Sequence, residues 1–307
     1  MKRAFTLLEL IIVIVILGII AMMSFNAIMN IYSNYFQTRT VNELETQTEI
    51  ALEQISKRLE HRIKPSVIAR KPSGGFLPLN DSRVNLNSGY EILEFIPYAY
   101  EIFNDVPSGS NKAGRYSGYV DLANSSPATG LISPGSNFTT EVIETIKDLT
   151  CKDDASGCVD FENKDGGVVA IFSDVYYDVQ NSFGYKDNLN LDIAKVGVKS
   201  TDGNTLEISG FANKQISEQY HLAYTANAIV PEQSADPKDT ANGVFDLNLY
   251  YDYRPWMGQG YKNGEKATLA KNVTRFVFTE KNGVIVLKLC MRAKNSEITI
   301  CKSKAVY

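Results

Sequence analysis

The feature that most constrains this chain is an apolar run near its start, from Phe5 to Met23, in a sequence of 307 residues. As a helix rising about 1.5 Å per residue, the run would extend roughly 29 Å, close to the hydrocarbon thickness of a bilayer. Lys2 and Arg3 precede it, and such cations stay on the cytoplasmic side of a membrane segment. The sequence therefore predicts one membrane-spanning helix with a cytoplasmic N-terminus.

A carboxylate interrupts this run about one helical turn from its start. Glu9 is flanked on both sides by leucine. A charged side chain inside a membrane helix costs about 2.5–3.5 kcal/mol on insertion scales, and such residues usually have a function. Near the interface the side chain can reach polar surroundings, which lowers this cost. Glu9 is either a tolerated interfacial residue or part of an assembly mechanism.

The string Lys-Arg-Ala-Phe-Thr-Leu-Leu-Glu-Leu, residues 2–10, resembles the processing site of type IV prepilins and pseudopilins. The resemblance implies that a prepilin peptidase removes residues 1–4 as a leader by cutting between Ala4 and Phe5. It also implies that Phe5 becomes the N-methylated N-terminus and that Glu9 is the glutamate used in filament assembly. The family usually has glycine where this chain has Ala4.

The resemblance gives Glu9 a physical role. After cleavage Phe5 would carry a free cationic amine near the apolar region, and Glu9 would pair with this amine in its own chain or in a neighbouring subunit. A paired charge is tolerable at low dielectric, whereas an unpaired one is not. The implied partners are the prepilin peptidase, other pilin or pseudopilin subunits, an inner-membrane assembly platform and inner-membrane lipid.

The helix is expected to continue well beyond the membrane. The first proline of the chain is Pro65, and helices usually end at or before the residue that precedes a proline. Apolar residues recur at three- and four-residue steps after residue 43, which predicts one face packed on the following domain. The predicted helix spans residues 5–64, with a transmembrane half at 5–23. The recurring positions are Leu44, Thr48, Leu52, Ile55, Leu59 and Ile63.

Residues 65–307 are expected to form an extracytoplasmic domain rich in antiparallel strands, so that the fold class is α+β. Glycine and proline indicate irregular structure at 65–90 and 104–140, with one short helix at 141–149. Predicted strands follow at 168–172, 191–198, 206–211, 221–230 and 244–251.

The C-terminal end gives the clearest strand pattern. Asn282-Gly283 separates two alternating apolar segments, which is a strong hairpin signal, and a second turn at 294–297 leads into a third strand. A meander over about 270–307 is therefore expected, and it supplies a sheet for the amphipathic half of the helix to cover. This part looks like the C-terminal sheet of minor pilins and pseudopilins of the J or W type.

The four cysteines form two pairs by spacing. Cys290 and Cys301 flank the second turn symmetrically and should face each other across neighbouring strands, while Cys151 and Cys158 would close a small loop. Disulfides persist outside the cytoplasm, where the predicted topology places all four residues. A metal site built from the four cysteines is the alternative, but metal ligands usually stand two to four residues apart.

Two further segments admit more than one interpretation. Acidic residues around the first cysteine pair suit either a calcium loop or a solvated loop, although their spacing does not fit an EF-hand. An aromatic cluster at 250–256, followed by Tyr261, would either bind a glycan or close the edge of a sheet. The acidic set comprises Asp153, Asp154, Asp160, Glu162, Asn163 and Asp165.

No feature of the sequence indicates catalysis. It contains no P-loop, dinucleotide fingerprint, HExxH or nucleophile elbow, and its only histidines, His61 and His221, are far apart. The net charge of −4 argues against a nucleic-acid-binding surface. We expect no enzyme activity, no cofactor, no metal and no direct nucleic-acid binding.

The sequence thus predicts a minor pilin or pseudopilin of a type II secretion, type IV pilus or DNA-uptake filament. It would be a single-pass protein of the bacterial inner membrane with a periplasmic C-terminal domain, associated with the filament after assembly. Two alternatives remain open. A signal-anchored periplasmic binding or sensor protein would keep residues 1–4 and tolerate replacement of Glu9. An anchored enzyme would need a convergent polar site in the ectodomain.

Overall fold

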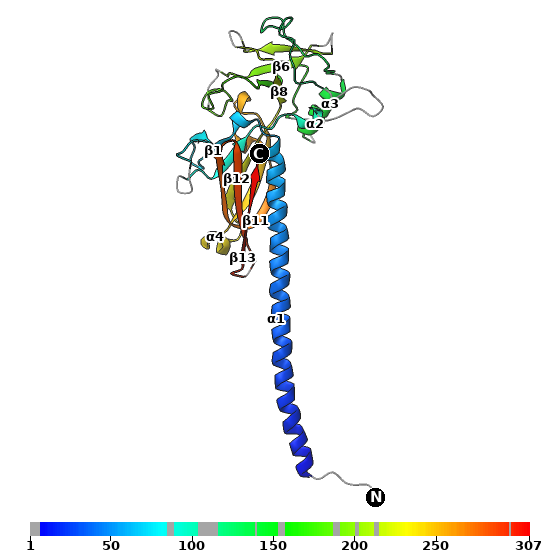
Figure 1. Ribbon diagram of the computed structural model, residues 1–307, viewed down its shortest axis with the longest axis vertical. Helices are drawn as coiled ribbons and strands as arrows, with labels where there is room; N and C mark the ends of the chain where they lie inside the picture. The colour runs from blue at the N-terminus through cyan, green and yellow to red at the C-terminus, as the bar shows by residue number, and fades with distance from the viewer. Residues whose placement is uncertain are drawn as a thin grey trace.

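One long helix, α1 (Leu7–Glu60), carries two β-sheets at its C-terminal end (Figure 1). This computed structural model describes residues 7–84, 89–103, 116–138, 140–152, 157–186, 191–199, 203–211, 215–294 and 296–307. The helix has 54 residues, so its axis is about 80 Å long. The α+β fold class expected from the sequence is confirmed.

The helix ends at Glu60, four residues before the expected Lys64. A 3₁₀ turn, η1 (Lys64–Ser66), follows, because Pro65 cannot continue the α-helical hydrogen bonds. Arg62 closes the end of the helix by donating from Nη1 to the carbonyl of Leu59 at 2.8 Å. The same guanidinium donates to the carbonyls of Gly283 at 2.9 Å and Tyr307 at 3.2 Å, so it ties the helix to two distant parts of the sheet.

The upper half of α1 packs on the first sheet along the predicted apolar face. The face is confirmed, with two small residues added to it. Ion pairs lie beside this contact: Lys302 Nζ is 2.7 Å from Glu49 and 3.2 Å from Glu45, and Lys304 pairs with Glu53. The buried residues of α1 are Leu44, Thr48, Ala51, Leu52, Ile55, Ser56 and Leu59.

Two isoleucines on α1 test this packing. Ile55 is fully buried, whereas Ile50 is 52 % exposed. We expect Ile55→Ala to lower the free energy of unfolding by about 2–5 kcal/mol, because it leaves a cavity between helix and sheet. Ile50→Ala should change it little. Chemical denaturation of both variants in the same detergent measures the difference, and equal effects would contradict the packing.

The first sheet has eight antiparallel strands in the order β13-β12-β11-β10-β9-β3-β1-β2. In chain order the strands are β1 (Ile68–Arg70), β2 (Phe76–Pro78), β3 (Ile92–Phe95), β9 (Ala226–Gln233), β10 (Phe245–Tyr253), β11 (Glu265–Lys281), β12 (Val284–Arg292) and β13 (Thr299–Val306). A short helix, α4 (Pro237–Ala241), connects β9 to β10.

The expected C-terminal meander is present as β11, β12 and β13. Asn282 and Gly283 make the tight turn between β11 and β12 with φ of 55° and 79°, the two positive values that such a turn requires. Strand β11 pairs with β10 up to Val273 and with β12 from Val273 onward. The register shifts at Val273, next to the left-handed Asn272 (φ 57°).

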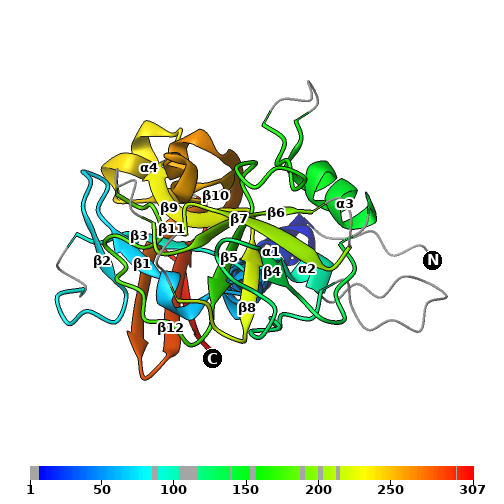
Figure 2. The same cartoon turned by 90° about the horizontal axis from the view of Figure 1, so that it is seen from above.

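The second sheet lies beyond the C-terminal end of α1, and β5 and β8 lie over that end when viewed from above (Figures 1 and 2). Its order is β4-β7-β6-β5-β8. Two helices accompany it, α2 (Tyr100–Phe103) and α3 (Thr140–Thr150), the latter at the expected place. The strands are β4 (Leu131–Ile132), β5 (Val169–Phe172), β6 (Ala194–Val198), β7 (Thr205–Ser209) and β8 (Tyr220–Ala223).

The prediction of a single strand at 221–230 was wrong. The segment 221–230, expected as a single strand, is divided between β8 in the second sheet and β9 in the first. The break lies at Tyr224-Thr225, where the hydroxyl of Thr225 accepts a hydrogen bond from the backbone of Asp252 at 2.9 Å. Both halves are apolar because both are buried, so hydrophobicity does not reveal where the chain changes sheets.

Part of the chain expected to be irregular also forms strands. Strands β1 and β2 lie within 65–90, and β4 lies within 104–140, of which residues 104–115 and 139 fall outside the described residues. These strands have only two or three residues each, which is too short for an alternating pattern. Their burial comes from the two sheets, which share a hydrophobic cluster that includes Ile68 from β1 and Val169 from β5.

Candidate assembly interface

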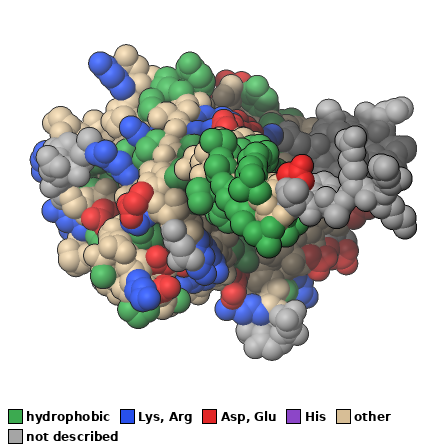
Figure 3. All heavy atoms as spheres, turned by 90° about the horizontal axis from the view of Figure 1, so that it is seen from below, with side chains coloured by type: hydrophobic (Ala, Val, Ile, Leu, Met, Phe, Trp, Pro, Cys, Tyr) green, Lys and Arg blue, Asp and Glu red, His purple; other side chains and the backbone are tan. Residues whose placement is uncertain are grey.

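The lower half of α1, which comprises residues 7–36, extends away from both sheets (Figure 1). Every large apolar side chain from Leu7 to Phe36 is at least 46 % exposed. The most apolar window of 18 residues has a mean hydropathy of 2.9, and none of it is buried. Apolar side chains surround the end of the helix when it is viewed from below (Figure 3). By length and composition this half of the helix can cross a membrane.

Glu9 lies in the first turn of α1, where a negative charge is favourable for the helix dipole. Its neighbours one turn further along are Ile12 and Val13, both about half exposed. Residues 1–6 lie outside the described residues. The predicted roles of Lys2, Arg3, Ala4 and Phe5 in topology, cleavage and N-methylation therefore stay predictions, as does the role of Glu9 in assembly.

The uncharged part of α1 is longer than the transmembrane half expected at 5–23. No charged residue stands between Glu9 and Arg39. Three aromatic side chains mark the upper end of this stretch: Tyr32 stacks on Phe36 at 6.3 Å between ring centroids, and Tyr35 meets Phe36 edge-on at 5.9 Å. Aromatic residues gather at membrane–water interfaces. This cluster was not predicted from the sequence, although its residues stand three and four positions apart, as they do on one face of a helix.

The structure contains both predicted disulfides, and all four cysteines take part. Cys290 and Cys301 are direct partners in the register of β12 and β13, with Cα atoms 4.0 Å apart. A short Cα distance is typical of antiparallel pairs that exchange no backbone hydrogen bonds. Since the sulfur atoms of all four cysteines are bonded in these two disulfides, the alternative of a metal site built from the four cysteines is not supported.

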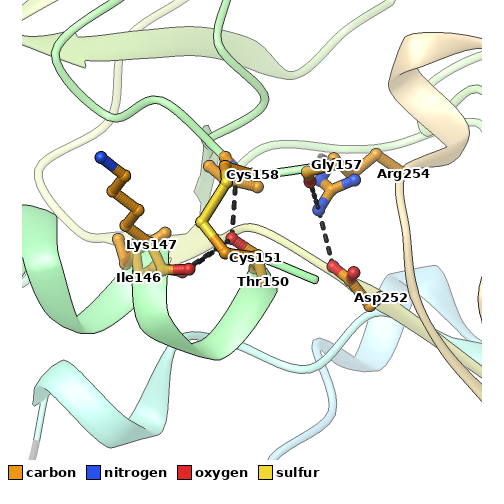
Figure 4. Close-up of a disulfide and its surroundings, with 9 residues drawn as sticks. Ile146, Lys147, Thr150, Cys151, Gly157, Cys158, Asp252 and Arg254 are labelled. Atoms are coloured by element: carbon orange, nitrogen blue, oxygen red, sulfur yellow. Dashed lines mark hydrogen bonds and ion pairs between the residues drawn. A yellow bond between two sulfur atoms is a disulfide. The ribbon is translucent and has the colours of Figure 1, made fainter. Parts of the chain in front are cut away.

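The Cys151–Cys158 disulfide lies near Asp252 and Arg254, at the end of β10 (Figure 4). Arg254 Nη2 donates to the carbonyl of Gly157 at 3.3 Å and lies 2.6 Å from Asp252 Oδ1. Burial raises the pKa of Asp252 to about 6, although the nearby cations Arg254 and Lys152 act to lower it. The described part of this disulfide loop is thus fixed to the first sheet by a nearly buried ion pair.

The two histidines, distant in sequence, meet the same tyrosine. His61 Nδ1 is 3.1 Å from the Tyr98 hydroxyl, and the His221 ring lies 5.2 Å from the Tyr98 ring. Burial lowers the pKa of His221, which favours its neutral form. Within the described residues, no three His, Cys, Asp or Glu side chains are placed to hold a metal ion.

Folding accounts for several residues of the acidic segment and of the aromatic cluster. Asp160 and Asn163 accept hydrogen bonds from backbone amides two residues ahead, as in Asx turns, while Asp153 and Asp154 lie outside the described residues. These contacts favour a solvated turn over a calcium loop. Tyr253 is fully buried and Trp256 is 3 % exposed, so the aromatic cluster mainly closes the core.

Residues 1–25 match the family model described as the prokaryotic N-terminal methylation motif. This match supports the type IV prepilin and pseudopilin family, which is a structural family. The motif implies processing by prepilin peptidase and assembly with other pilins, and together with the apolar helix it fits a membrane-anchored pilin. No curated protein and no solved structure matches the chain.

Proposed function

We propose that this chain is a minor pilin or pseudopilin subunit that assembles into an envelope-spanning filament through the lower half of α1. The filament would belong to a type II secretion system, a type IV pilus or a DNA-uptake system. The subunit performs no chemistry; it is itself a substrate of the prepilin peptidase. The J/W-type assignment rests on the C-terminal meander and is part of this proposal.

The observation that carries the proposal is the exposed apolar length of α1. A plain membrane anchor needs about 20 apolar residues, after which a flexible linker is sufficient. Here the same helix continues without interruption into the packed core at Leu44, so the ectodomain is held rigidly on its membrane segment. A filament subunit uses such a helix twice, first in lipid and then against the helices of other subunits.

The proposed topology follows from the N-terminal charges. Lys2 and Arg3 keep the N-terminus cytoplasmic, and the two disulfides suit a periplasmic ectodomain. Before assembly the chain is a single-pass protein of the inner membrane, in contact with lipid and with the assembly platform. After cleavage between Ala4 and Phe5, removal of the basic leader leaves the Phe5 amine near Glu9.

Mass spectrometry of the N-terminal peptide tests this function directly. The full chain, purified from membranes of cells with an active prepilin peptidase, is expected to begin at N-methylated Phe5. The same chain from cells without the peptidase should begin at Met1 and serves as the control. A chain that still begins at Met1 when the peptidase is active would instead support a signal-anchored periplasmic binding or sensor protein.

A further inference from the structure

A groove crosses the region where the two sheets meet, and it is built from two adjoining clefts. The first, of about 530 Å³, lies between β1, β2, β3 and the segment that connects β10 to β11. The second, of about 620 Å³, lies between that segment and β6. Lys186, Pro255 and Gly258 line both clefts, so the two clefts lie next to each other.

Cations outnumber acids in the walls of this groove. Among the residues that the structure describes, four cationic side chains line it and two carboxylates do, Glu94 and Asp165. Both carboxylates are already engaged: Glu94 with Arg70, and Asp165 with the hydroxyl of Ser209 at 2.6 Å. In a chain of net charge −4 this is a local excess of positive charge. The cations are Arg70, Lys186, Lys195 and Lys262.

Arg70 is held in place by three contacts. Its Nε is 2.6 Å from Glu94 Oε2, and its Nη2 donates to the carbonyl of Tyr185 at 3.3 Å. The guanidinium also lies over the Phe76 ring, 5.0 Å from its centroid. These contacts use two of its five donors and fix its plane. The side chain remains 16 % exposed where it lines the first cleft, so it is oriented in advance for a carboxylate.

The second cleft supplies apolar contacts beside this charge. Leu191, Ile193 and Trp256 line it, together with Met257, which is 42 % exposed. Trp256 is held in place by donating from Nε1 to the carbonyl of Gly167 at 2.9 Å. A ligand that fills both clefts needs anionic groups at one end and apolar side chains at the other.

We propose that this groove binds an extended acidic peptide segment of a partner protein. Its carboxylates would contact Arg70, Lys186 and Lys262 in the first cleft, and an apolar side chain would lie beside Trp256 in the second. A carboxylate matches the planar guanidinium with two parallel hydrogen bonds. The groove lies on the ectodomain, away from the lower half of α1.

Trp256 is the only tryptophan of the chain and reports on the groove by its fluorescence. The full chain in non-ionic detergent is titrated with an acetylated octapeptide of alternating aspartate and leucine. We expect a saturable change in emission with a dissociation constant below about 1 mM, weakened by salt. The matched octapeptide with asparagine in place of aspartate should bind at least tenfold more weakly.

Charge reversal locates the binding site. Lys186→Glu with Lys262→Glu should weaken binding of the aspartate peptide at least tenfold, whereas Lys271→Glu with Lys294→Glu, outside the groove, should leave it unchanged. Unaltered Trp256 emission without peptide verifies that each variant is folded. The proposal fails if the two peptides bind equally, if neither saturates, or if both pairs of substitutions have the same effect.

Discussion

Replacing Glu9 with alanine is expected to lower incorporation of this chain into its filament by more than tenfold, while the ectodomain stays folded. The proposed partner of Glu9 is the Phe5 amine, in the same or a neighbouring subunit. Two opposite charges 4 Å apart attract each other by about 4 kcal/mol at an effective dielectric constant of 20. Losing a third of this attraction already changes a binding constant about tenfold.

The matched control is Glu43→Ala on the same helix. Glu43 is exposed above the apolar stretch and accepts a hydrogen bond from Gln47 at 3.3 Å. Its replacement removes an equal charge without touching the membrane segment, so incorporation should persist. Sheared filaments and membranes are compared by quantitative immunoblotting, with N-terminal processing verified in each variant. If Glu9→Ala assembles as well as Glu43→Ala does, Glu9 has no role in subunit register.

The sequence predicted the helix and the meander because these elements depend on local patterns. The three- and four-residue spacing around Leu52 and Ile55 identified the buried face of α1, and Asn282-Gly283 located a hairpin turn that only positive φ values permit. The cysteine pair at 290 and 301 followed from symmetry about the next turn. In each case neighbouring residues carry the information.

The groove and the division into two sheets depend on contacts between distant segments. Arg70 lies 24 residues before Glu94 in the chain and 115 before Tyr185, and no local pattern connects the three. Likewise, the chain changes sheets at Thr225 inside an apolar segment that looks continuous. The N-terminal candidate site was recognisable because its residues lie within a short motif, whereas the groove is assembled by the fold.

Replacing Arg70 with methionine should lower the free energy of unfolding by about 3–5 kcal/mol, the usual cost of removing one partner of a buried ion pair. Glu94 is 1 % exposed and also accepts a hydrogen bond from the Tyr253 hydroxyl at 3.0 Å. Methionine fills the space beside Phe76 but leaves the carboxylate without its cation. Adding Glu94→Gln to this variant should recover part of the loss, because the amide oxygen still accepts from Tyr253 and carries no charge.

The exposed pair of Arg83 and Asp81 provides the control, because its atoms are also 2.6 Å apart but the Arg83 side chain is 70 % exposed. Arg83→Met should leave stability nearly unchanged, since solvent screens the remaining charge. Chemical denaturation in detergent, followed by Trp256 fluorescence, compares the variants. A loss at Arg83 equal to that at Arg70 would show that burial of the pair does not determine its contribution.

The pH dependence of the Arg70→Met variant gives a second, independent readout. Burial already raises the pKa of Glu94 above its ordinary value of 4.5, although the positive charge of Arg70 acts to lower it. Removing Arg70 leaves only the hydrogen bond from Tyr253 to oppose the effect of burial, so the pKa of Glu94 should rise further. A carboxyl that binds its proton more tightly when folded makes stability fall as the pH increases above 4.5. The loss of unfolding free energy caused by Arg70→Met should therefore be largest at neutral pH and become smaller on acidification. A loss that does not change with pH would mean that the variant is destabilised by lost packing and not by the unpaired charge of Glu94.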